Sequence, residues 1–257
     1  MKAVFSTLLA IAVVLPAGVW LATLQQASSH PVPTAIGASG MPGSGDPAAP
    51  DQSADISAAA PQASAGAQHK VLYVDQQWLQ QISARTGISP RALKAYSQAT
   101  LNQAWHSPAC HLGWNTLAAI GYLESADATI GGKQLRPDGS ASEKIIGPAL
   151  DGEHFAKVLD TDGGALDGDR VFDRAIGPLQ FLPATWAQYG KDGNGDGLAD
   201  PQNIDDAAWS AAAYLCASGT DLRNAEAWNA AILAYNPSQD YLHSILQRAD
   251  LYAELAR

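Results

Sequence analysis

Hydrophobic positions recur with a helical period over most of the chain after residue 70. Residues 75–85 are typical of a first helix, which the turn Thr86-Gly87 would end. Ser89 is a suitable N-cap for a second helix that has Pro90 at its first position. No segment alternates hydrophobic and polar residues for long enough to predict a sheet. The pattern therefore predicts a mainly all-α fold.

The same period predicts four further helices after residue 110. They are expected at about 114–125, 206–217, 225–235 and from Ser238 onward, and Gly219 and Asn236-Pro237 supply stop signals. The last helix would place one set of residues on its apolar face: Tyr241, Ile245, Leu246, Ala249 and Tyr252.

The first 69 residues differ in composition from the rest. Residues 1–26 carry Lys2 ahead of an apolar run of roughly 20 residues, which predicts an export segment, either a signal peptide or an uncleaved membrane anchor. Residues 27–69 are dominated by Ala, Ser, Gly, Pro and Gln, as in a flexible linker. The folded domain is therefore expected over residues 70–257.

The chain has 25 acidic and 15 basic residues, a formal net charge of -10. Such a balance argues against nucleic acid or an anionic membrane surface as the main partner. There is no HExxH, GxSxG, Walker A or GxGxxG motif, which argues against the common zinc, serine hydrolase and nucleotide sites.

Two cysteines occur, Cys110 and Cys216. Because an exported chain folds where disulfides persist, we expect them to pair. The alternative is two separately buried thiols.

Glu124 is the single acid in the predicted helix WNTLAAIGYLES, which is apolar nearly all round and should lie inside the domain. Leu117, Ile120 and Gly121 precede it at helical spacing, so its carboxyl would project from an apolar stripe. Burial and the negative end of the helix dipole both favour the protonated form. The alternative is a partly exposed Glu at a fraying helix end.

A glycine-spaced acidic loop follows residue 190. Oxygen-bearing side chains occupy its first, third and fifth places: Asp192, Asn194 and Asp196. With Gly197 at the sixth place, this spacing is typical of a loop that binds one hard cation. The twelfth place is Asn203 rather than Glu, so the closing carboxylate would come from Asp205 or Asp206. The alternative is a solvated Asn/Asp/Gly turn.

Residues 129–173 form a long acidic and glycine-rich loop region, and loops of this length are usually functional. Its acids could line a cleft or hold a cation: Asp162, Asp167, Asp169 and Asp173. Because their spacings match no ligand template, a second metal is not expected here.

Four blocks together resemble the lytic murein transglycosylases of the membrane-bound B type. They are YLES at 122–125, AIGPLQFLPATW at 175–186, DGNGDG at 192–197 and AILAYN at 231–236. Their order and spacing also match, over most of residues 112–246. The resemblance implies a lysozyme-like helical domain that cleaves the β-1,4 bond between N-acetylmuramic acid and N-acetylglucosamine and leaves a 1,6-anhydro ring.

By this resemblance Glu124 takes the place of the family's single catalytic Glu. The resemblance also implies four substrate-binding residues: Ser125, Gln180, Tyr235 and Asn236. It implies a structural calcium ion with five ligands: Asp192, Asn194, Asp196, the Leu198 carbonyl and Asp206. Two departures affect the cleft and the cation site, since Ser-Ala-Asp-Ala follows Glu124 where the family has Thr/Ser-x-x-Gly, and the loop's third place is Asn194.

One carboxyl suffices when the substrate's own acetamido and C6 hydroxyl groups replace a second one. A hydrolytic muramidase using an aspartate of residues 160–173 is the alternative enzyme. The alternative from another class is an inactive, calcium-stabilised peptidoglycan-binding module. Gln180, Tyr235 and Asn236 also allow structural roles as a helix-loop cap, a core aromatic and a C-cap. We expect an exported, monomeric protein of the cell envelope, or a secreted one, whose partners are peptidoglycan glycan strands.

Overall fold

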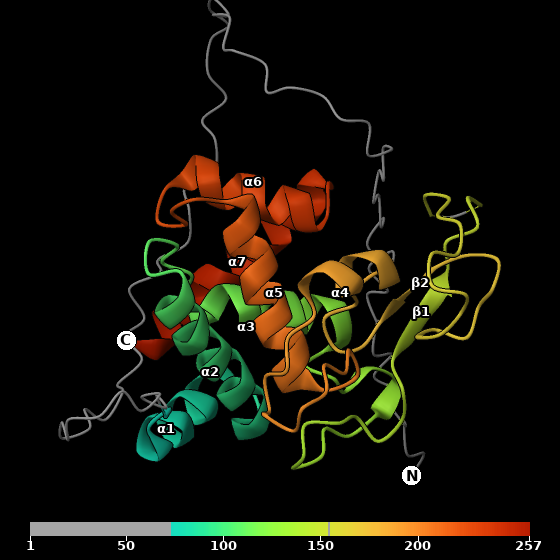
Figure 1. Ribbon diagram of the computed structural model, residues 1–257. Helices are drawn as coiled ribbons and strands as arrows, with labels where there is room; N and C mark the ends of the chain where they lie inside the picture. Colours follow the sequence, from blue (N-terminus) through green and yellow to red (C-terminus); the bar gives the residue numbers. More distant parts are fainter. Residues whose placement is uncertain (1–72, 154) are drawn as a thin grey trace, which may run out of the picture.

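The computed structural model describes residues 73–257 except residue 154 (Figure 1). In this part the chain forms seven α-helices: α1 Gln76–Thr86, α2 Pro90–His106, α3 Trp114–Ser125, α4 Pro183–Tyr189, α5 Ile204–Ser218, α6 Ala225–Tyr235 and α7 Gln239–Ala256. The prediction of a mainly helical domain is confirmed. The predicted export segment 1–26 and linker 27–69 lie outside the described residues. None of the helices in the described part is long and apolar enough to cross a bilayer.

Side-chain caps explain where most helices begin. Asp75 accepts a hydrogen bond from the Trp78 amide at the start of α1, and Ser89 caps α2 with Pro90 at the first helical position. Asn203 caps α5, so this helix begins two residues before the predicted start at residue 206. Ser238 caps α7 by accepting from the Tyr241 amide.

Helix α3 lies in the middle of the domain, between α2, α5 and α7 (Figure 1). Its apolar side chains are almost all fully buried, as expected for a helix that is hydrophobic on every face. Large aromatic side chains pack around it: Tyr96 from α2, Trp114 at its own start, Trp228 from α6 and Tyr252 from α7. This packing holds the C-terminal end of α3 in a fixed position inside the fold.

A small antiparallel sheet, which the sequence pattern did not predict, pairs β1 Ile146–Ala149 with β2 Arg174–Ile176. It lies at one side of the helices, in the acidic loop region (Figure 1). The strands have four and three residues and a register irregularity between them. Strands so short cannot show a recognisable period-two pattern, and for this reason the pattern of residues does not predict them.

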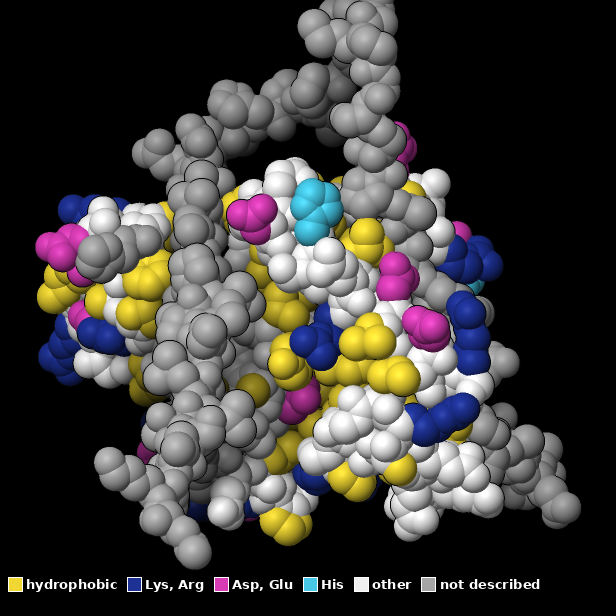
Figure 2. Space-filling model, turned by 180° about the vertical axis from the view of Figure 1, so that it is seen from behind, with side chains coloured by type: hydrophobic (Ala, Val, Ile, Leu, Met, Phe, Trp, Pro, Cys, Tyr) yellow, Lys and Arg dark blue, Asp and Glu magenta, His cyan; other side chains and the backbone are white. Residues whose placement is uncertain are grey.

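Cys110 and Cys216 form a disulfide with Cα atoms 5.5 Å apart, as predicted. The bond joins the segment after α2 to the end of α5, and the Cys110 carbonyl also accepts from the Leu222 amide. On the face seen in Figure 2, Lys and Arg side chains are spread among hydrophobic and polar ones and form no single basic patch, in keeping with the net charge.

Candidate active site

Glu124 lies at the C-terminal end of α3. The residue is buried, with 9% of its surface exposed, and the Tyr241 hydroxyl donates a 2.6 Å hydrogen bond to Glu124 Oε1. Burial raises the pKa of Glu124 to about 8, against a smaller lowering by the Tyr241 hydrogen bond. The carboxyl is therefore protonated at neutral pH and can donate its proton. It is a buried acid and not an exposed Glu at a fraying helix end.

Tyr241 reaches Glu124 from the first turn of α7. The helical pattern predicts Tyr241 on the apolar face of the last helix but does not predict its contact with the acid. The signal in the sequence is slight: Tyr241 follows the N-cap Ser238 by three residues, so the cap fixes its position at the start of the helix. Only the packing of α7 on α3 turns that position into a hydrogen bond.

A tight turn at residues 177–180 accepts hydrogen bonds from the side chains of Ser125 and Tyr235. Gly177 has φ +76, and an added Cβ there would lie 1.7 Å from the Pro201 carbonyl oxygen, so only glycine fits. The Pro178 carbonyl accepts from Ser125 Oγ (2.7 Å), and the Leu179 carbonyl accepts from the Tyr235 hydroxyl (2.6 Å). Residues from α3 and α6 are thereby held on one turn.

Ser125 and Gln180 are both occupied within the protein. Ser125 is fully buried, and its hydroxyl also accepts from the Ala128 amide at 2.8 Å. Gln180 is 7% exposed, has φ +50, and donates from Nε2 to the Gly177 carbonyl at 2.9 Å. Both side chains stabilise the turn, and their contact with substrate stays a prediction.

Tyr235 and Asn236 end α6 beside the acid. Burial raises the pKa of Tyr235 well above its ordinary value, and the charge of Glu124 adds to this increase. Asn236 is the C-cap of α6 and accepts from the Ser238 amide through Oδ1. Its Nδ2 is buried without a hydrogen-bond partner. An unsatisfied buried donor is costly, and a contact of Asn236 with substrate stays a prediction.

The glycine-spaced loop is closed by Asp206 and not by Asp205. Asp206 is fully buried and accepts from the Gly193 and Asn194 amides through Oδ1 and from the Asp200 amide through Oδ2. Asp205 turns away from the loop and forms an ion pair with Arg91. Of the two acids considered from the sequence, Asp206 is therefore the one that faces the loop.

The side chains of Asp192, Asn194 and Asp196 also form hydrogen bonds within the loop. Asp192 accepts from the amides of Gly195 and Gly197, and Asn194 Nδ2 donates to Asp196 Oδ2 at 2.9 Å. The Leu198 side chain is exposed. The donor set consists of carboxylate, amide and carbonyl oxygens, which is the chemistry that calcium prefers.

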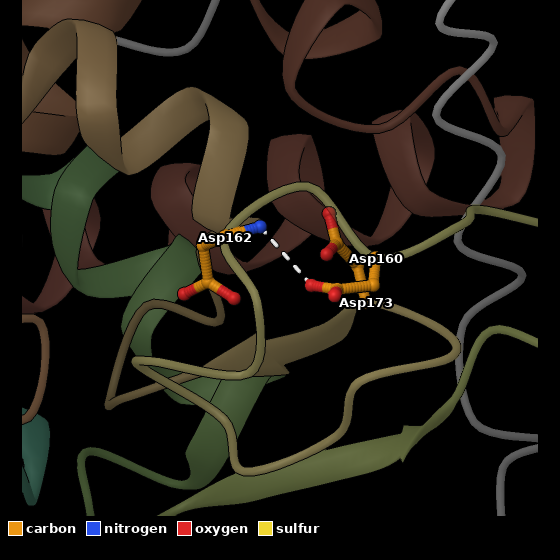
Figure 3. A group of neighbouring side chains, drawn as sticks. All are labelled: Asp160, Asp162 and Asp173. Atoms are coloured by element: carbon orange, nitrogen blue, oxygen red, sulfur yellow. Dashed lines mark hydrogen bonds between the residues drawn. The ribbon is translucent and has the colours of Figure 1, made fainter.

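A second group of acidic residues lies in the segment 129–173, where the spacing of the acids did not predict a metal site. Carboxylate oxygens of Asp160, Asp162 and Asp173 lie within 4.8 Å of one another and could hold a metal ion (Figure 3). Among the described residues, no other group of three or more Asp, Glu, His or Cys side chains has its ligand atoms this close together. Local spacing could not show it, because the antiparallel bridge between Leu159 and Phe172 brings Asp173 back beside Asp160.

The remaining acids of this segment hold the loop together. Asp167 accepts from the Arg174 amide, and Asp169 forms an ion pair with the Arg174 side chain at 2.9 Å. The fully buried Asp173 accepts from both the amide and the hydroxyl of Thr161.

Part of the domain is similar to a known protein family. Residues 172–232 match the family model described as the Transglycosylase SLT domain. Over these residues the chain is similar to a transglycosylase SLT domain, in agreement with the family resemblance seen in the sequence. The match includes Gln180 and the loop at 192–206, while Glu124 precedes it and Tyr235 follows it.

Among solved structures, the chain is similar to the Escherichia coli lytic transglycosylase Slt35 in complex with bulgecin A. The identity is 14% and the TM-score 0.42, and the similarity covers 69% of this chain and 78% of that chain. No curated protein matches the chain. The disulfide and the peptidoglycan-acting domain together indicate a location outside the cytoplasm.

Proposed function

We propose that the protein is a lytic transglycosylase. It cleaves the β-1,4 bond between N-acetylmuramic acid and N-acetylglucosamine in peptidoglycan and leaves a 1,6-anhydromuramic acid end. The observation that carries the proposal is the burial of Glu124, which keeps its carboxyl protonated at neutral pH. We include in the proposal a lysozyme-like arrangement of the helices.

In the proposed reaction Glu124 acts first as an acid and then as a base. Its proton passes to the glycosidic oxygen as the bond from that oxygen to C1 of muramic acid breaks. The buried carboxylate then removes the proton from the C6 hydroxyl, whose oxygen bonds to C1 and closes the ring. A pKa of about 8 suits both steps, because the group is protonated at the start and strongly basic after the transfer.

The groups around Glu124 have distinct parts in this proposal. Tyr241 fixes the carboxyl by its hydrogen bond, and the free Nδ2 of Asn236 binds an acceptor oxygen of the sugar. Tyr235 and Gln180 line the site from the end of α6 and from the turn at 177–180. Ser125 acts on the site through its bond to Pro178.

Calcium is a structural partner in the proposal. Five oxygen donors of the loop would hold it: Asp192, Asn194, Asp196, the Leu198 carbonyl and Asp206. The buried Asp206 at the closing place supports this assignment, since an ion would compensate its carboxylate where burial raises the pKa. A bound ion would fix the loop that contacts Gly177, and through it the turn beside Tyr235.

The hydrolytic alternative needs a second free carboxylate. Aspartates 160, 162, 167, 169 and 173 all accept hydrogen bonds from backbone amides of their own loop region. Carboxylates committed in this way are poorly placed to activate water, which favours the single-acid reaction. The inactive binding module is disfavoured by the buried, protonated state of Glu124, which a binding surface does not need.

The test compares Glu124→Gln with the matched control Glu143→Gln, whose side chain is 77% exposed and forms an ion pair with Lys133. General acid and base catalysis contributes about 10²- to 10⁴-fold, so Glu124→Gln should lose at least about 10²-fold in turnover while still binding purified glycan. Glu143→Gln should match the wild type. Near-normal turnover in Glu124→Gln would refute the proposal.

A further inference from the structure

The backbone directly after Glu124 and Ser125 is strained. Ala126, Asp127 and Ala128 have φ values of 51, 58 and 69, three consecutive non-glycine residues in the left-handed region. Each such residue costs about 1–2 kcal/mol, and alanine has no side chain that could offset the cost locally. The turn therefore persists only because its surroundings hold it.

One side chain of the turn connects it to another helix. Asp127 Oδ1 accepts a 2.8 Å hydrogen bond from the hydroxyl of Tyr96, which α2 places fully inside the core. The Asp127 amide also donates to the carbonyl of Gly121, six residues earlier in α3. Asp127 is thus bound through both its side chain and its backbone.

Gly121 makes the contact with Tyr96 possible. A Cβ at this position would lie 1.9 Å from the Tyr96 hydroxyl oxygen. Glycine inside a helix costs about 1 kcal/mol relative to alanine. Its presence here is explained by the need to admit the Tyr96 hydroxyl beside the turn.

The charges around Asp127 favour an ionised acceptor at neutral pH. Burial raises the pKa of Asp127 to about 6, and the Tyr96 hydrogen bond and the charge of Arg248 lower it. Arg248 stands on α7, seven residues after Tyr241, with its guanidinium carbon 3.8 Å from the centre of the Tyr122 ring. Tyr252 is the other titratable group whose charge couples to Asp127.

We propose that Asp127 is a positioning residue for Glu124: its bond to Tyr96 locks the left-handed turn that fixes the end of α3. The inference rests on the proposed function, because it assigns Asp127 to the reaction of Glu124. The sequence departs from the family's Thr/Ser-x-x-Gly run at the residue after Asp127, since Ala128 stands where that run has glycine. A glycine would adopt the left-handed conformation at low energetic cost, whereas here the Tyr96–Asp127 hydrogen bond stabilises the turn.

The experiment uses three variants of the full chain and one control. Tyr96→Phe removes only the hydroxyl, Asp127→Ala removes the acceptor, and Asp127→Asn keeps an acceptor oxygen and tolerates the left-handed conformation. Ser83→Ala removes a comparable hydroxyl hydrogen bond, to the Ile88 carbonyl, in the α1 region. The readouts are kcat and KM on soluble glycan strands and the pKa of the Glu124 carboxyl by carbon NMR.

Tyr96→Phe and Asp127→Ala should lower kcat by about tenfold or more with KM nearly unchanged, because they misplace the acid without touching the binding groups. In both, the pKa of Glu124 should fall from about 8 towards its ordinary value as water reaches the carboxyl. Asp127→Asn and Ser83→Ala should keep the wild-type kcat and pKa.

The inference is overturned if Tyr96→Phe keeps both the kcat and the Glu124 pKa of the wild type, a result that leaves the proposed function intact. It is also overturned if Asp127→Asn loses as much as Asp127→Ala, since position would then not be what matters. A wild-type protein that releases no glycan product overturns the proposed function and this inference together. If Asp127→Ala does not fold, Tyr96→Phe alone decides.

Discussion

Removal of the Tyr241 hydroxyl should move the pH dependence of the reaction in a defined direction. The 2.6 Å hydrogen bond from Tyr241 stabilises the ionised form of Glu124 and so lowers its pKa. A hydrogen bond to a charged group is worth about 1.5–3 kcal/mol, and one pKa unit corresponds to about 1.4 kcal/mol. Tyr241→Phe should therefore raise the pKa of Glu124 by about 1 to 2 units.

The assay is the pH profile of kcat/KM on soluble glycan strands. Because the reaction needs Glu124 protonated, activity falls as pH rises through its pKa, near 8 in the wild type. In Tyr241→Phe this alkaline limb should lie about 1 to 2 pH units higher. Tyr189→Phe is the control, since the Tyr189 ring packs on Tyr214. A limb that stays in place or moves to lower pH would show that Tyr241 does not control the acid.

Three further predictions concern stability. Because the pKa of Glu124 is raised from 4.5 to about 8 in the folded state, the free energy of unfolding should decrease as the pH rises from 4.5 to about 8. Glu124→Gln should therefore have a higher melting temperature than the wild type at pH 8–9 but not at pH 4. Equal melting temperatures at pH 8–9 would contradict this. Replacing Cys110 and Cys216 by Ser should lower the free energy of unfolding by about 4 to 5 kcal/mol in the chain-entropy model, because the bond closes a loop of 106 residues; an unchanged denaturant midpoint would refute it. Calcium at 100 times its dissociation constant should add about 2.7 kcal/mol in melting curves against chelator. Loss of this gain in Asp196→Asn assigns it to the loop at 192–206, loss in Asp160→Asn assigns it to the triad, and no gain in the wild type contradicts calcium binding.

The helices could be predicted from the sequence because their signals are local. Caps such as Ser89 and Ser238 and the stop at Gly87 lie within a few residues of the helix ends that they define. The burial of Glu124 was also predictable, since the apolar character of α3 surrounds a single acid.

What the sequence could not show depends on contacts between distant residues. Tyr241 and Glu124 are 117 positions apart, and the acidic triad forms only because a short hairpin returns Asp173 to Asp160. The spacing of the acids within residues 160–173 therefore could not predict this candidate metal site. The left-handed turn at Ala126 has no local signal either, since glycine is missing where such a turn usually has it.

The mass of the products released from purified peptidoglycan tests the central claim most directly. If Glu124 catalyses intramolecular ring closure, the wild-type protein should release 1,6-anhydromuramic acid products, each lighter by one water than the corresponding hydrolytic product, and Glu124→Gln should release almost none. Products that all carry reducing ends would contradict this account and favour the hydrolytic alternative.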